Sequence, residues 1–208
     1  MTAILAFFAV ALTVGGAFAQ TIEGLAASGP FPEHAEKLML FGQFVGDWDL
    51  DVVNHLPDGS RSPQPSRRGG GAPRLQEKTT KGEWHFGWVL EGRAIQDVWR
   101  VPPRAELETA SDPPTGYGTT VRFYDPQIDA WHVTWNGVVT GSVFVFVARQ
   151  QGDEIVMEAQ GERELSRWIF SHIAKESFRW RAVVSTDGGT TWITEQEMVA
   201  RRRPAPRR

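Results

Sequence analysis

Along most of the chain, apolar and polar residues alternate with a period of two, which is typical of β-strands that bury one face and expose the other. Early in this pattern Trp48, Leu50 and Val52 alternate with three aspartates. Similar alternation, divided by turn sequences, recurs in residues 82–101, 119–135, 143–160, 167–170 and 176–201. Together these segments predict about ten strands joined mostly by short reversals, and hence an all-β, antiparallel up-and-down barrel.

Departures from the alternation mark the other parts of the chain. Residues 33–44 have the one convincing helical periodicity. A single short helix before the first strand argues against every parallel α/β fold. Residues 54–81 and 102–116 contain clusters of Gly, Pro or Ser, so we predict two long loops there.

The first residues indicate export. Residues 3–19 are apolar or small, carry no charge and end in Ala17-Phe18-Ala19, which matches the hydrophobic region and cleavage site of a signal peptide. We therefore predict a signal peptide (1–19), a flexible lead (20–32), one barrel domain (33–203) and a basic tail (204–208), in a periplasmic or secreted protein. An uncleaved membrane anchor and a misplaced start are the alternatives. No later segment is apolar for long enough to predict stable membrane insertion.

Composition narrows the chemistry. A formal net charge of −3 argues against nucleic-acid binding, and the absence of cysteine excludes disulfides and thiolate metal sites. No motif calls for a cofactor or a metal. Two alternatives stay open: a metal site assembled across strands from Glu83, His85 and His132, and a haem held by one histidine.

Residues 44–48, with the sequence FVGDW, resemble the opening of lipocalin-like (calycin) barrels. In those proteins a short helix precedes a Gly-x-Trp on the first strand, the Trp closes one end of the barrel, and an Arg of the last strand packs over it. The resemblance implies these structural roles for Gly46 and Trp48. It implies Arg201 as the preferred arginine, with Arg202 as the second choice, and a guanidinium over the ring would add about 1 kcal/mol.

The region 41–203 as a whole resembles a group of bacterial lipocalin-like proteins to which no function is assigned. Blocks similar to residues 82–88, 92–99 and 122–126 are shared with that group. Barrels of this superfamily bind small apolar ligands or haem, or in some cases catalyse cyclisations and isomerisations. The resemblance therefore implies a fold and leaves the activity open.

A second motif lies in residues 185–192, whose sequence STDGGTTW resembles the Asp-box of sialidase propellers. One copy in a chain of this length does not predict a propeller, because propellers repeat the motif in each blade. We interpret it as a hairpin turn with structural residues only. Asp187 would accept turn amides, Gly189 would adopt a positive φ, and Trp192 would pack on the hairpin.

The aromatic rows decide what the barrel interior contains. Trp84 and Trp88 alternate with Glu83 and His85, so only one of the two rows faces inward. We favour an aromatic interior, whose cavity walls would be Trp84, Trp88, Trp99, Trp135 and Trp180. The predicted polar contacts are His85, Arg122 and His132. In the opposite register the lumen would instead hold Glu83, His85, Gln96, Arg122, His132 and Glu158.

These features favour an exported monomer or homodimer that binds a small apolar or aromatic molecule in a pre-formed cavity. One alternative is a cavity enzyme, an isomerase, cyclase or lyase, with His85 or His132 as general acid/base. A further alternative is an interaction module that docks through exposed tryptophan rows.

Overall fold

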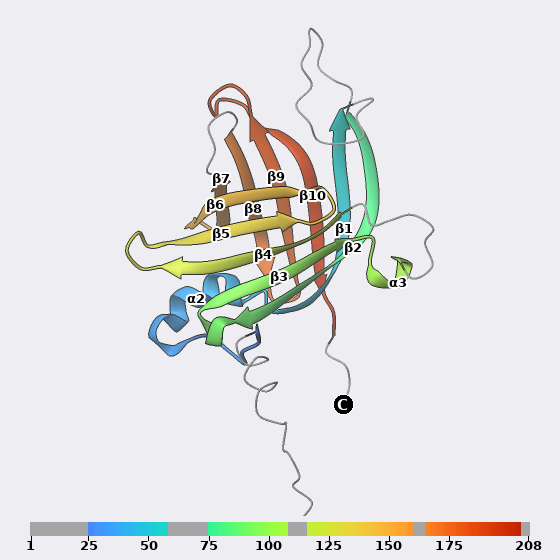
Figure 1. Cartoon of the computed structure of the whole chain (residues 1–208). Coiled ribbons are helices and arrows are strands. Elements are labelled where there is room, and N and C mark those ends of the chain that lie inside the picture. The colour runs from blue at the N-terminus through green and yellow to red at the C-terminus, as the bar shows by residue number, and fades with distance from the viewer. Residues whose placement is uncertain (1–24, 58–74, 108–115, 160–164, 205–208) are drawn as a thin grey trace, which may run out of the picture.

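In the computed structural model, which describes residues 25–57, 75–107, 116–159 and 165–204, ten antiparallel strands form a closed barrel. The predicted fold class is therefore confirmed. The strands are β1 (Gly46–Pro57), β2 (Leu75–Val89), β3 (Ala94–Val101), β4 (Gly116–Asp125), β5 (Ala130–Gly137), β6 (Ser142–Gln151), β7 (Glu154–Ala159), β8 (Leu165–Ala174), β9 (Ser177–Ser185) and β10 (Ile193–Arg202). Each pairs with its neighbours in sequence, and β1 pairs with β10 to close the barrel. Figure 1 shows β3–β6 crossing in front of β8–β10.

The first hairpin is longer than its sequence indicates. β1 and β2 pair as far as Pro57 and Leu75, so residues 54–57 and 75–81 are strand, where we predicted a loop. Strand pairing is carried by backbone hydrogen bonds, so a segment without apolar alternation can still join a sheet. The middle of that predicted loop, 58–74, lies outside the described residues.

A short helical segment closes one end of the barrel. η1 (Pro32–His34) and α2 (Ala35–Gly42) replace the continuous helix expected over 33–44. Leu38, Phe41 and Phe44 are buried, so this segment covers the lower end of the barrel in Figure 1. Two further helical turns connect strands: η2 (Leu90–Gly92) follows β2, and α3 (Arg104–Leu107) follows β3 inside the second predicted loop. The predicted signal peptide and nearly all of the basic tail lie outside the described residues.

The aromatic rows face inward, as favoured. Trp84, Phe86 and Trp88 on β2 are buried in the main hydrophobic core, whereas His85 on the alternate face lies on the outer wall. Burying large rings in the interior removes much apolar surface from water, and this contribution exceeds that of any single polar contact in the wall. The register in which the polar row lines the lumen is excluded for this strand.

Trp48 lies at the closed end of the barrel, where the resemblance placed it, but the arginine over it is Arg202 and not Arg201. The Arg202 guanidinium lies 4.1 Å from the Trp48 ring centroid. Strand register is the reason: Trp48 is directly opposite Arg202, whereas Arg201 is opposite Asp49 and points outward to an ion pair with Asp51. The preferred assignment to Arg201 was wrong by one residue, which is one reversal of strand face.

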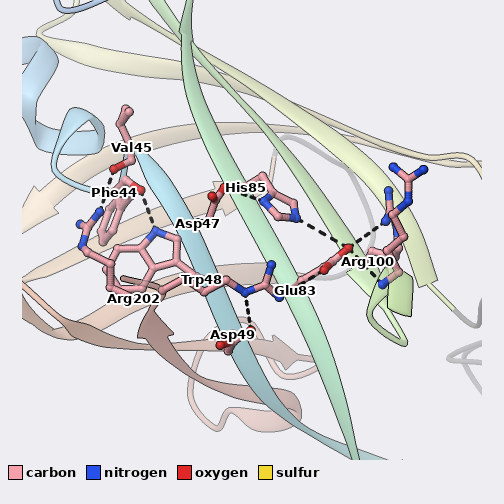
Figure 2. A network of polar contacts seen from close by, with 11 residues as sticks. Phe44, Val45, Asp47, Trp48, Asp49, Glu83, His85, Arg100 and Arg202 are labelled. Carbon is pink, nitrogen blue, oxygen red and sulfur yellow. Dashed lines mark hydrogen bonds and ion pairs between the residues drawn. The ribbon is translucent and has the colours of Figure 1, made fainter. Parts of the chain in front are cut away.

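Arg202 also holds the entry of the chain into β1. Its guanidinium donates to the carbonyl oxygens of Gln43, Val45 and Lys175, each at 2.8 Å, and the Trp48 indole N–H donates to the Phe44 carbonyl at 2.7 Å. Gly46 has a φ of +127°, and a Cβ there would lie 2.8 Å from the Arg202 Nη1. These contacts, part of which Figure 2 shows, require glycine at this position.

The Asp-box sequence forms the β9–β10 turn, as we interpreted it. The Ser185 hydroxyl and the Thr191 amide donate to the Asp187 carboxylate at 2.8 and 2.9 Å. Gly189 has a φ of +90°, and Trp192 packs on the outside of the barrel in a small cluster with Val156, Ile169 and Val183.

Candidate ligand-binding cavity

A cavity of about 90 Å³ lies inside the barrel, on the side of the aromatic core away from α2. Trp84 forms its floor and packs on Phe170 and Phe178, which in turn pack on Phe44 beside the helix. The lining residues come from β2, β3, β4, β5, β8, β9 and β10: Trp84, Trp99, Thr120, Trp135, Trp168, Trp180, Gln196 and Met198. A dry cavity of about 150 Å³ accepts benzene, so a single small ring is the upper limit for this smaller space and would enter only with some outward movement of the walls.

Five tryptophan side chains surround the cavity. Successive centroids lie 6.3 Å apart for Trp84–Trp180, 5.3 Å for Trp180–Trp168, 5.8 Å for Trp168–Trp135 and 5.9 Å for Trp135–Trp99. Trp99 is opposite Trp84 in the β2–β3 register, which completes the ring. Neighbouring planes meet at 68–84°, so each ring is held by edge-to-face contact with the next.

A glycine on β4 makes room for one of these walls. A Cβ at Gly118 would overlap the indole of Trp135, which lies against the β4 backbone. Any larger residue would push Trp135 toward the cavity. The small residue therefore sets the width of the cavity at this point.

Three lining residues carry buried polar atoms that have no hydrogen-bond partner among the described residues: Trp84 Nε1, Trp180 Nε1 and Thr120 Oγ1. All three residues are at most 4% exposed. Leaving such a group unpaired in the interior costs roughly 1–3 kcal/mol, so native proteins rarely do so without a reason. Three other polar groups of the lining have partners: Trp99 Nε1 contacts the Met198 sulfur at 3.2 Å, Trp135 Nε1 donates to the Ser142 hydroxyl at 3.4 Å, and the Gln196 amide donates to Asn54 at 2.6 Å.

A buried ion pair separates this cavity from the helix. Asp97 on β3 and Arg122 on β4 contact each other directly, and both side chains are fully buried. The Arg122 guanidinium lies 5.2 Å from the Phe41 ring centroid and 5.5 Å from that of Phe86. Its Nε and Nη2 have no hydrogen-bond partner among the described residues, but ring faces provide a weak substitute. The Thr120 amide donates to Asp97, so the pair also fixes the strand that carries a cavity residue.

His85 belongs to a polar network on the outer wall, which Figure 2 shows from close by. Its Nδ1 is 2.7 Å from Asp47 Oδ1, and its Nε2 is 3.6 Å from Glu83 Oε1. Glu83, itself nearly buried, contacts Arg100 at 2.8 Å and Arg203 at 3.2 Å. The network ties β1, β2, β3 and the end of the chain together on the outside.

The same network sets the charge of Glu83. Burial by itself raises the pKa of this carboxyl group. The backbone amide of Arg104 and the guanidinium of Arg203 outweigh burial by donating hydrogen bonds to the carboxylate, and the charge of His85 adds to them. The pKa of Glu83 therefore lies below its usual range, and the group is an ionised structural partner.

His132 on β5 is also outside the lumen. Its Nε2 is 3.0 Å from Asp125, and its ring packs on Phe123 of β4. β5 pairs with β4 and β6, so the structure does not bring His132 to His85 and Glu83 on β2. Neither histidine lines the cavity. Gln96 and Glu158, the other residues of the alternative polar lumen, bond to outward-facing partners, Thr119 and Arg167.

Of the predicted cavity residues, the structure brings together Trp84, Trp99, Trp135 and Trp180. Trp88 is buried nearer the helix, where it packs on Gly42, and Arg122 lies in the ion pair below the cavity. Four lining residues were not predicted from the sequence: Trp168, Thr120, Gln196 and Met198. Trp168 could have been found, because it alternates with Phe170 on β8 and both therefore face inward.

A larger concavity of about 350 Å³ lies along β8–β10 and β1. Its lining consists mainly of outward-facing residues such as Arg179, Arg181 and Glu197. Arg181 bonds to Glu154 at 3.0 Å. We take the interior cavity as the candidate site, because five tryptophans line it and three of its lining residues have polar atoms without a hydrogen-bond partner among the described residues.

Within the described ranges, the structure contains no group of three or more His, Asp or Glu side chains placed to hold a metal ion. The same ranges include no helix that is both long and apolar enough to span a membrane.

No protein-family model and no curated protein sequence matches the chain. Among solved structures, the S-type phycobiliprotein lyase from Guillardia theta matches 85% of this chain and 100% of its own. The sequence identity is 11% and the TM-score is 0.48. A likeness at this level carries no argument about what the present chain does. The closed ten-stranded barrel itself fits a lipocalin-like architecture.

Proposed function

We propose that this chain is an exported barrel that binds a small apolar or aromatic molecule in the cavity between its five tryptophans. The observation that carries the proposal is the group of five tryptophans that lines the cavity, Trp84, Trp99, Trp135, Trp168 and Trp180. Aromatic walls bury much of the surface of an apolar ligand, and specific pockets combine walls of this kind with a few placed polar groups. The Trp48–Arg202 contact also supports kinship with lipocalin-like barrels.

A cavity-filling variant tests the binding site. Gln196→Trp places an indole in a cavity of about 90 Å³ and should abolish binding of toluene or phenol, measured by ligand-detected NMR titration to about 10 mM. Glu197→Trp adds the same side chain to the outer face of the same strand and should leave binding unchanged. Binding of neither molecule to the natural chain, together with a ligand-free native mass, contradicts the proposal.

Export rests on residues 3–19 and their Ala17-Phe18-Ala19 end. The exported product should begin at Gln20, and its intact mass measures this directly. A mass that still includes residues 1–19 would show an anchor in place of a signal peptide.

The geometry does not favour the alternatives. His85 and His132 lie on the outer wall, so neither can act as general acid/base on a molecule in the cavity or as an axial haem ligand there. The tryptophans of the aromatic rows face the interior of the barrel, so they do not form the docking face of exposed tryptophan rows that the interaction module would need.

A further inference from the structure

We propose that the cavity selects a single-ring molecule that carries a hydrogen-bond acceptor, with the indole N–H groups of Trp84 and Trp180 and the hydroxyl of Thr120 as the selecting groups. This inference rests on the proposed function and names the chemical class of its ligand. It excludes a purely hydrocarbon ligand and a small quaternary ammonium ion, the two other classes that aromatic walls can accept.

Two buried indole N–H groups, those of Trp84 and Trp180, lack a hydrogen-bond partner among the described residues. An indole N–H can only donate, so two unpaired indoles call for an acceptor. Both residues are 4% exposed and their N–H groups have almost no accessible surface, so an acceptor would reach them only as the neighbouring rings move apart. The edge-to-face contact between the two rings, at 84°, offers at most the weak acceptor of a ring face. An acceptor on a bound molecule would satisfy groups that the protein leaves unpaired.

The cavity lining also lacks a negative charge that could compensate a cation. No Asp or Glu lines the cavity, and the nearest buried carboxylate, Asp97, is already paired with Arg122. A cation in this cavity would therefore have ring faces but no counter-ion, while Arg122 lies two residues from Thr120 on the same strand. The electrostatics favour a neutral or negatively charged acceptor.

The volume of the cavity limits the size of the ligand. A volume of about 90 Å³ is below the roughly 150 Å³ of a cavity that accepts benzene, so a single ring with one small substituent is the upper limit and a fused ring system is excluded. The narrow point set by Gly118 and Trp135 limits expansion, because an indole already lies against the strand backbone there.

Phenol and toluene make a matched pair of probes, because they have the same number of heavy atoms and nearly the same shape. A cavity without usable donors prefers toluene, since phenol loses its hydrogen bonds to water. We expect phenol to bind about 10-fold more tightly than toluene, by ligand-detected NMR titration of the natural chain. Tetramethylammonium should bind more weakly than phenol.

Substitutions test whether the indole N–H groups and the Thr120 hydroxyl cause the preference for phenol over toluene. Trp84→Phe combined with Trp180→Phe removes both N–H groups and keeps aromatic walls, and it should remove most of the preference for phenol. Thr120→Val, which keeps the shape of the side chain, should lower that preference by a smaller factor, about 2- to 3-fold, on its own. Trp192→Phe removes an indole that bonds to Gly189 outside the barrel and is the control that should change nothing. Circular dichroism verifies the fold of each variant.

The outcomes separate the two proposals. If toluene binds as tightly as phenol, or if tetramethylammonium binds more tightly than both, the cavity binds ligands but the acceptor class is wrong. The same conclusion follows if phenol is preferred and the preference survives in the double variant and in Thr120→Val. If neither ring binds at all, the proposed function fails, and this inference fails with it.

Discussion

At the scale of single residues, two neighbouring arginines on β10 have very different surroundings. Arg202 faces the barrel end, covers the Trp48 ring and donates to three backbone carbonyl groups. Arg201 faces solvent and pairs with Asp51, which also contacts Lys81. Without Arg202 the buried Trp48 ring and the part-buried Val45 carbonyl would lose a charged partner that water replaces poorly, whereas an exposed ion pair contributes little.

Removing each arginine should therefore have unequal effects. We expect Arg202→Ala to lower the free energy of unfolding by about 2–4 kcal/mol, from lost charged hydrogen bonds and the lost cation–π contact. Arg201→Ala should change it by less than about 1 kcal/mol. Urea unfolding of both variants measures the difference, and equal losses would contradict the assignment of Arg202 as the structural arginine.

At the scale of elements, the β9–β10 turn depends on one carboxylate. Asp187 accepts hydrogen bonds from the Thr191 hydroxyl at 2.6 Å and the Thr191 amide at 2.9 Å, and also from Ser185. These bonds lower the pKa of Asp187 from 3.8 to about 2. Because the pKa is lower in the folded than in the unfolded chain, the ionised form stabilises the fold above pH 4, and this stabilisation is lost as the pH falls toward 2.

Asp187→Asn should consequently lower the urea midpoint at pH 7, because the amide nitrogen cannot accept from the Thr191 hydroxyl. The difference from the natural chain should shrink between pH 4 and pH 2, where the natural carboxylate becomes protonated. Asp153→Asn, in the exposed β6–β7 turn, is the control. A difference that stays constant with pH would show that ionisation of Asp187 does not stabilise the turn.

At the scale of the whole molecule, the pair Asp97–Arg122 joins three parts that are distant in the chain. Arg122 lies over Phe41 of α2 and over Phe170 of β8, and Asp97 accepts from the amide of Thr120, a cavity residue. The closing helix, the barrel wall and the cavity therefore all contact one fully buried ion pair. Removing either residue of the pair would leave the other charge without a partner in an apolar interior.

We expect Asp97→Asn to destabilise the fold by about 3–5 kcal/mol, because Arg122 then has no buried counter-charge. Replacing both residues, as Asp97→Leu with Arg122→Met, should restore most of this loss, since a buried pair and an apolar pair of similar volume are often equivalent. Denaturant unfolding of the single and double variants forms the test. A loss below about 1 kcal/mol in the single variant would mean that water reaches the pair.

The local pattern predicted the fold class, most hairpins and the inward direction of the aromatic rows. Alternation along a strand and a short turn after it involve residues that are near each other in sequence, so they can be recognised without knowing the partners. Long polar stretches were the exception, and the ends of β1 and β2 were missed because backbone pairing leaves no signature in the side chains.

The sequence by itself thus determined a ten-stranded barrel with an aromatic interior and four of the five cavity tryptophans. Only the tertiary structure decided that Trp88 lies outside the cavity lining, that Arg202 and not Arg201 covers Trp48, and that His85 and His132 stay outside. These features depend on the register between strands far apart in the chain and on the closure of the barrel by β1 and β10. A shift of one residue reverses the face of every side chain in a strand, so register must be known before a site can be placed.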